Sequence, residues 1–173
     1  MRTETLQGFQ LSPQQKHLWL LQHKSNIYLS QAVIEIKGKV DLIVLQTAFQ
    51  KIIARQEILR TNFYRRSGVS TPFQVIAENQ EIFWQSIDVK DVSKQEIELK
   101  IIELLQLEKS AKFNLEPDSL LRLLLVNLND NCHYLIITLP SLCADSQTIN
   151  NLLQELSLSY SYCLQGKDFV EEP

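Results

Sequence analysis

Residues 137–149 read ITLPSLCADSQTI, and they join an apolar run to a helical pattern. The run before them, His133 to Leu139, has the composition of a buried strand. Asp145 stands where an N-cap is expected, because its side chain can accept hydrogen bonds from the first free N–H groups of a helix. Apolar residues then recur at helical spacing: Ile149, Leu152, Leu153, Leu156 and Tyr160. The stretch therefore predicts a strand-to-helix junction, a place where enzymes often hold reactive side chains.

The strands predicted around this junction are short and mostly consecutive. Leu120 to Leu128 and His133 to Leu139 are apolar runs joined by Asn129-Asp130-Asn131, which indicates a hairpin of buried strands. Four further runs have strand-like patterns: Tyr28 to Lys37, Leu59 to Arg65, Pro72 to Ala77 and Ile82 to Val89. We expect a mostly antiparallel sheet.

Three more helices are indicated by caps and by apolar spacing. Ser12, Pro13 and Gln15 form a capping-box pattern that opens a helix to about His23. Asp41 caps a second helix whose apolar face is Leu42, Leu45, Phe49, Ile52 and Ile53. Ser93 opens a long helix, whose Glu- and Lys-rich stretch from Lys94 to Lys112 is most simply a solvated outer face. The fold class is therefore α+β, with helices covering the sheet.

Composition excludes several classes of function. The chain has 173 residues, of which 45% are hydrophobic and 21% charged, with a net charge of −3. Nucleic-acid-binding domains usually carry a basic face, so we expect no nucleic-acid partner. No apolar run reaches the roughly 18 residues of a membrane span, and the first residues lack the layout of a signal peptide. Cys132, Cys143 and Cys163 are an odd number at unrelated spacings, which favours reduced thiols in a cytoplasmic protein.

Three ordered stretches resemble the N-terminal half of a condensation domain from nonribosomal peptide synthetases. Residues 11–21, LSPQQKHLWLL, resemble the opening motif of that family, a Ser, then Gln, then a basic residue before Leu-Trp. Residues 55–63, RQEILRTNF, are similar to its second motif, RHExLRTxF, with Gln56 in place of the His. Phe113-Asn114-Leu115 followed by Leu120-Leu121-Arg122 is similar to the segment before the hairpin. The resemblance runs from about Gln10 to Gly166.

The third motif of that family, HHxxxDG, falls on the junction. The resemblance implies that its second His deprotonates or orients the acceptor amine, a role that suits imidazole because its pKa lies near working pH. Here the two His positions hold Pro140 and Ser141, the Asp is Asp145, and the Gly is replaced by Ser146. A serine hydroxyl cannot accept a proton near neutral pH without its own base. We therefore expect no catalytic residue at these positions.

The remaining candidates for chemistry have simpler structural roles. Asp145 can cap the last helix, and it can also pair with Arg60 or Arg122, since the resemblance implies that this aspartate is held by an arginine. Cys143 is more simply a small buried residue than a reactive thiol. His133 lies at the start of its strand, away from the junction. No spacing of His, Cys or carboxylate residues suggests a metal site.

The resemblance implies a chloramphenicol-acetyltransferase-like fold, of which residues 1–173 would be the N-terminal subdomain, with the C-terminal half absent. We expect a non-catalytic condensation-like module that serves as scaffold or docking element. The alternative is an acyl-transferring half-domain whose second half or partner chain supplies the catalytic group. An unrelated α+β binding domain is a third reading, which the ordered motifs disfavour.

The expected partners follow from the same resemblance. They are the second half of the domain and carrier-protein, adenylation or tailoring domains, with no membrane and with possible self-association. No cofactor is expected to bind directly. The phosphopantetheine arm of a carrier protein would enter if the family role is kept.

Overall fold

The computed structural model describes residues 8–22, 28–89, 92–111, 113, 115 and 120–167. The elements, in chain order, are β1 (Gly8–Gln10), α1 (Pro13–Gln22), β2 (Leu29–Lys37), α2 (Leu42–Arg55), η1 (Glu57–Arg60), β3 (Thr61–Tyr64), β4 (Phe73–Ile76), β5 (Phe83–Asp88), α3 (Lys94–Ser110), β6 (Arg122–Asn129), β7 (Cys132–Pro140) and α4 (Ser146–Leu164). None of the helices in these ranges is long and apolar enough to cross a membrane.

The larger sheet has four strands in the order β2-β7-β6-β5. The predicted hairpin is confirmed as β6 and β7, and β2 pairs antiparallel to β7 from Leu29 opposite Pro140 to Lys37 opposite Cys132. β5 runs parallel to β6, because α3 connects the two strands and returns the chain to the same end of the sheet. The sheet is thus mostly antiparallel, as predicted, with β5 the exception.

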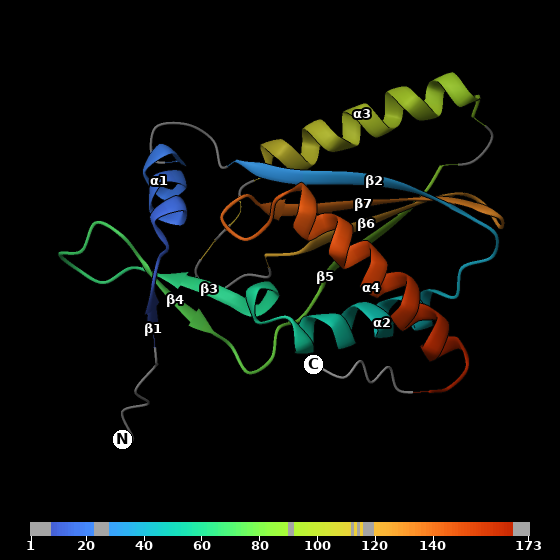
Figure 1. The fold of residues 1–173 in the computed structure, drawn as a ribbon. Helices are drawn as coiled ribbons and strands as arrows, with labels where there is room; N and C mark the ends of the chain where they lie inside the picture. The colour runs from blue at the N-terminus through green and yellow to red at the C-terminus, as the bar shows by residue number, and fades with distance from the viewer. Residues whose placement is uncertain are drawn as a thin grey trace.

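Helices cover both faces of this sheet (Figure 1). α2 and α4 lie on one face, where Phe49 and Ile52 pack in one cluster with inward residues of β6 and β7 such as Leu123 and Ile137. α3 lies on the other face, where Leu104 packs against the alternate residues Leu124, Val126 and Ile136. Because both faces of β6 and β7 are buried, these strands are continuous apolar runs rather than alternating ones.

A second sheet of three strands, β1-β4-β3, lies with α1 beside the end of the main sheet where β7 meets α4 (Figure 1). The predicted strand Leu59 to Arg65 is wrong in its first part, which is the 3-10 helix η1, and only Thr61–Tyr64 is extended. The Thr61 hydroxyl donates to the Glu57 carbonyl over 2.8 Å, a local bond that favours the turn over a strand. β1 was not predicted, since three residues carry no periodic signal.

The predicted helices are confirmed with small shifts at their ends. α1 extends over Pro13–Gln22, and His23 lies outside the described residues. α3 ends at Ser110, and Lys112 is likewise outside them. The outer face of α3 is exposed as expected, but it is not purely polar. Three leucine and isoleucine side chains on it are more than half exposed: Leu99, Ile102 and Leu107.

Candidate functional site

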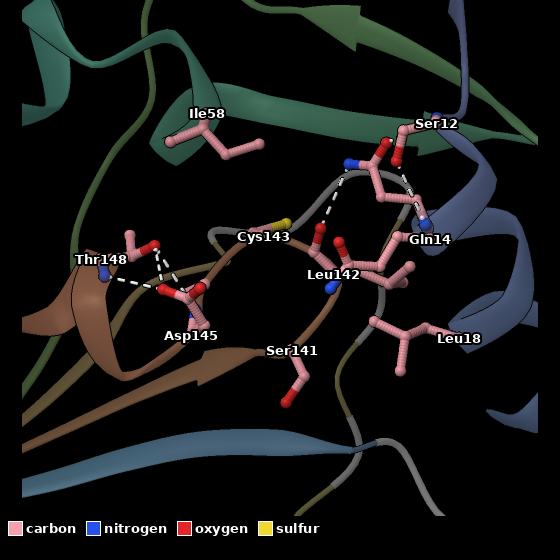
Figure 2. A pocket seen from close by; sticks show the side chains of 11 residues that line it. Ser12, Gln14, Leu18, Ile58, Ser141, Leu142, Cys143, Asp145 and Thr148 are labelled. Carbon is pink, nitrogen blue, oxygen red and sulfur yellow. Dashed lines mark hydrogen bonds between the residues drawn. The ribbon is translucent and has the colours of Figure 1, made fainter.

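A cavity of about 300 Å³, here called the junction cavity, lies where β7 ends and α4 begins (Figure 2). Its wall is formed by the start of α1, by one residue of η1 and by the junction itself. The lining residues are Ser12, Gln14, Gln15, Leu18, Ile58, Ser141, Leu142, Cys143, Ala144, Asp145 and Thr148. The stretch singled out in the sequence therefore does border a cavity, between segments that are about 130 residues apart in the chain.

The backbone of the junction is fixed by hydrogen bonds on both sides. Pro140 is the last residue of β7, and the Ser141 N–H donates to the Tyr28 carbonyl just before β2, over 2.8 Å. The N–H groups of Cys143 and Ala144 then donate back to the Pro140 carbonyl over 2.9 and 3.2 Å. This tight turn holds the side chain of residue 141 in one direction relative to the sheet.

The Ser141 hydroxyl is bonded as a donor and has no base beside it. The Ser30 hydroxyl donates to the Ala144 carbonyl over 2.7 Å, which uses the only proton that a serine hydroxyl has. The contact of 3.2 Å between the two hydroxyl oxygens is therefore a bond from Ser141 to Ser30. Figure 2 shows the Ser141 side chain pointing toward β2. A nucleophilic serine needs an acceptor that can take its proton, and Ser30 cannot do this near neutral pH.

Asp145 is the N-cap of α4, which was one of its two predicted roles. Its Oδ1 accepts bonds from the Thr148 N–H and from the Thr148 hydroxyl, both over 2.8 Å. The Asp145 N–H donates to the Thr148 hydroxyl oxygen over 3.4 Å, which completes a capping box. These bonds to the carboxylate, first that from the Thr148 backbone and then that from its hydroxyl, lower the pKa of Asp145. A carboxylate held in this way is a poor proton acceptor.

The other predicted role of Asp145 is not found, since the structure does not bring it to either arginine. Asp145 is exposed, whereas Arg60 donates from Nη1 to the Ala77 carbonyl over 2.6 Å. Arg122 lies 3.9 Å from Glu108, and its guanidinium lies 3.8 Å from the centre of the Phe113 ring. An exposed cap needs no buried counter-ion, so the aspartate is held by its own helix instead of by an ion pair.

Of the remaining candidate residues, Cys143 lines the junction cavity, whereas His133 and His17 are not among its lining residues. Cys143 is buried, and this burial raises the pKa of its thiol, which makes the thiolate that would react scarce. His133 lies at the other end of β7, buried, with Nδ1 2.9 Å from the Asn127 side-chain oxygen. His17 is exposed on α1. In the described part of the chain, no group of three or more His, Cys, Asp and Glu residues could hold a metal ion.

Gln15 is the residue at this site that sequence reasoning missed. It was identified only as the partner of Ser12 in the capping box, and those bonds are present at 3.0 and 3.2 Å. Its Nε2 also donates to the Leu142 carbonyl and lies within bonding distance of the Gln74 Oε1, each over 3.1 Å. The side chain thus ties α1 to both the junction and β4. No local pattern could reveal bonds that cross 59 and 127 positions of the chain.

Gln56, which stands where the related motif has a histidine, also makes a long-range bond. Its Nε2 donates to the Glu155 carboxylate of α4 over 2.7 Å. The bond joins the end of α2 to the middle of α4. The motif position is therefore used here to hold two helices together.

The fold is of the chloramphenicol-acetyltransferase-like class, which is the fold of the solved condensation domains that it matches. The chain belongs to the condensation-domain family, whose model matches residues 6–173. The resemblance drawn from the sequence motifs is thereby confirmed.

Curated relatives are very large peptide synthetases. The chain is 32% identical over 157 residues to the nonribosomal peptide synthetase kk1B of Curvularia clavata, covering 89% of this chain and 1% of that protein. It is 30% identical over 145 residues to bacitracin synthase 3 of Bacillus licheniformis, covering 84% of this chain and 2% of that protein. The chain thus spans a very small part of the relatives that it matches.

Solved structures confirm the fold. The starter condensation domain of the rhizomide synthetase RzmA, in a mutant form, superposes with a TM-score of 0.83 at 17% identity, covering 96% of this chain and 40% of that one. The X-domain from teicoplanin biosynthesis superposes with a TM-score of 0.80 at 22% identity, covering 100% of this chain and 36% of that one. At these identities the likeness concerns the fold alone.

Proposed function

We propose that this chain acts in a nonribosomal peptide synthetase as a condensation-type scaffold or docking element that supplies no catalytic base of its own. The observation that carries this proposal is the Ser141 hydroxyl, which stands at the position of the motif's second His and donates its proton to Ser30. The two titratable residues of the junction cavity, Asp145 and Cys143, are shifted away from base or nucleophile function, one by capping bonds and the other by burial.

The architecture around the missing base is nevertheless kept. The junction cavity, the capping box of α4 and the bonds of Gln15 hold the end of β7 and the start of α4 in a fixed position. This supports a role in which shape is retained while proton transfer is not. The expected partners are carrier-protein, adenylation or tailoring domains of the same assembly, and a phosphopantetheine arm would come only with a carrier protein.

A second function also has support, because the chain covers only 36–42% of the length of the solved chains that it matches. We propose residues 1–173 as the N-terminal subdomain of a condensation-like domain. In that arrangement the second half, or another chain, would face the junction cavity and could bring a proton acceptor to it. The chain would then be half of an acyl-transferring site.

The two functions are separated by incubating the chain with loaded donor and acceptor carrier proteins, with and without a separately supplied C-terminal half of a condensation domain. We expect no peptide product above the carrier-only control in either reaction, because no described group of the junction can accept the amine proton. Product that appears only with the added half would establish the second function.

Ser141→Ala tests the role of the junction serine in the same assay. We expect any background rate to be unchanged, because the hydroxyl donates to Ser30 and has no base. Ser146→Ala, an exposed serine in the first turn of α4, serves as the matched control. A rate above the control that is lost in Ser141→Ala and kept in Ser146→Ala would contradict the scaffold proposal.

A further inference from the structure

A second cavity, here called the distal cavity, lies between the C-terminal end of β2, the start of α2 and residues 153–160 of α4. Its volume is about 370 Å³, and it shares no lining residue with the junction cavity. Most of its wall is made of aliphatic side chains, including Ile34, Ile36, Val40, Leu153 and Leu156. Small-molecule sites are typically cavities of roughly 300–1,000 Å³ with apolar walls and few polar groups, and the distal cavity meets both conditions.

One polar side chain of the wall has an unused proton. The Tyr160 hydroxyl accepts a hydrogen bond from the Asp41 N–H over 2.9 Å, which fixes the position of its oxygen at the start of α2. Among the described residues its own proton has no acceptor, so the hydroxyl can donate to a ligand. The half-buried Tyr160 is thus held by one hydrogen bond that it accepts, and its hydroxyl can still donate one.

The charged residues of β2 beside the cavity point away from it. Ile34 and Ile36 pack with residues of α2 and α4, and Glu35 and Lys37 alternate with them, so the two charged side chains lie on the opposite face of the strand. There they pair with each other over 3.4 Å. The cavity therefore offers no charged side chain to an ionic head group from this strand. A carbonyl oxygen is a sufficient acceptor for the Tyr160 proton, and it suits a ligand that is otherwise apolar.

The volume of the cavity and the residues of its wall indicate the length and the aliphatic character of the ligand. At roughly 30 Å³ for each water-sized unit, the cavity holds on the order of ten heavy atoms. Tyr160 is the one aromatic residue among those that line it, and the other apolar residues are aliphatic. We propose that the distal cavity binds an aliphatic acyl chain of about eight carbons, whose carbonyl or carboxylate oxygen accepts a hydrogen bond from the Tyr160 hydroxyl.

The test is a titration of the full chain, labelled at isoleucine methyl groups, with octanoate and octanamide, followed by nuclear magnetic resonance. We expect the Ile34 and Ile36 signals to shift, and the signal of Ile58 in the junction cavity to stay. Octanamide represents an acyl chain with a neutral carbonyl group, and octanoate represents a free fatty acid. The compound that binds more tightly shows which of these two kinds of acyl chain the cavity prefers. Butanoate is the control for chain length. Equal affinity for butanoate, shifts at Ile58 alone or no shifts at all would overturn the proposal.

Variants locate the binding in the cavity. Leu153→Trp fills the cavity and is expected to weaken octanoate binding at least about tenfold, whereas Leu158→Trp, on the exposed side of the same helix, should leave it within about twofold. Tyr160→Phe removes one hydrogen bond and should weaken binding about two- to tenfold. If Leu153→Trp does not fold, Ile36→Phe fills the cavity from the opposite wall. Unchanged affinity in the filled variant would contradict the proposal.

Discussion

The carboxylate of Asp145 acts on the backbone of its own helix. Both of its short contacts go to Thr148, three residues further on, and the side chain is exposed to solvent. Its contribution to stability is therefore that of an N-cap: it satisfies donors that the first turn of α4 would otherwise leave open. The junction keeps its geometry through these local bonds and through Gln15, without an ion pair at the aspartate.

We expect Asp145→Ala to lower Tm by about 2–4 °C, because it removes the side-chain acceptor of the cap. Asp145→Asn retains an acceptor oxygen and should cause a smaller change at pH 7. Ser146→Ala, next in the chain and exposed, is the control. Thermal unfolding of the four proteins measures the effect. A large loss in both Asp145 variants would indicate a buried charge partner instead of a cap.

The difference between the wild type and Asp145→Asn should depend on pH. The Thr148 bonds lower the pKa of Asp145 in the folded state, so the charged carboxylate stabilises the fold above the unfolded pKa of about 3.9. This contribution is lost as pH falls through the lower folded pKa. The gap between the two Tm values should therefore stay constant from pH 7 down to about pH 4 and close as pH falls further, and a gap that does not close would contradict the assignment.

At the residue scale, contacts between residues that are close in the chain could be predicted from the sequence, whereas contacts between distant residues could not. The caps formed by Ser12, Asp41 and Asp145 depend on residues two or three positions apart, and all are present. The expected pairing of Asp145 with an arginine depended on which distant side chain comes near. In the structure Arg60 donates to a backbone carbonyl, and Arg122 lies beside Glu108 and Phe113. Contacts of this kind cannot be predicted from the residues next to each arginine in the chain.

At the scale of elements, the close contact between α2 and α4 depends on two small residues. Ala48 on α2 and Ser159 on α4 are fully buried, and the Ser159 hydroxyl donates to the Ala48 carbonyl over 3.3 Å. Larger side chains here would push the helices apart and disturb the cluster around Phe49 and Ile52.

Substitutions at Ser159 test this contact. Ser159→Leu should lower the free energy of unfolding by about 1–3 kcal/mol or more, because the site has no room for it. Ser159→Ala loses one hydrogen bond and should cost only about 1 kcal/mol. Denaturant midpoints measure both, with the exposed Ser161→Leu as the matched control on the same helix. Equal effects of Ser159→Leu and Ser161→Leu would show that the helices are not closely packed here.

The elements that the sequence predicted well are those with long apolar patterns. α2 and α4 each bury one face, which appears in the sequence as apolar residues at helical spacing. The β6–β7 hairpin is buried on both faces, which appears as two continuous apolar runs. β1 and η1 are too short to show a period, and the parallel pairing of β5 depends on the crossover through α3. The division of the strands into two sheets depends on long-range pairing, which cannot be predicted from the sequence of any single strand.

At the scale of the molecule, several large apolar side chains remain exposed on different elements. Ile43 at the start of α2 is 77% exposed and Leu99 on α3 is 68% exposed. Others with more than 45% exposure among the described residues are Phe9, Leu20, Phe83, Ile102, Leu107 and Leu164. Single exposed apolar side chains are common, but three of these, Leu99, Ile102 and Leu107, lie on one helix, α3, and apolar residues that gather on one surface often mark contacts with other chains.

We therefore expect the isolated chain to self-associate as its concentration rises, which sedimentation velocity would detect together with binding of an apolar dye. Ile43→Lys and Leu99→Lys should each reduce association if its own face takes part, whereas Glu98→Lys, beside Leu99, controls for added charge. A monomer at all concentrations that binds no dye would contradict this expectation.

The pairing of β2 with β7 also has a consequence for synthesis on the ribosome. Leu29 lies opposite Pro140, so the first strand of the main sheet pairs with one that is translated about a hundred residues later. At roughly 5–20 residues per second, β2 emerges some 5–20 s before β7 exists. During that interval β2 is without the strand that it pairs with in the fold. We therefore expect a nascent polypeptide of this fold to leave the backbone hydrogen-bonding groups of β2 unpaired by β7 until the hairpin that carries the junction has left the exit tunnel.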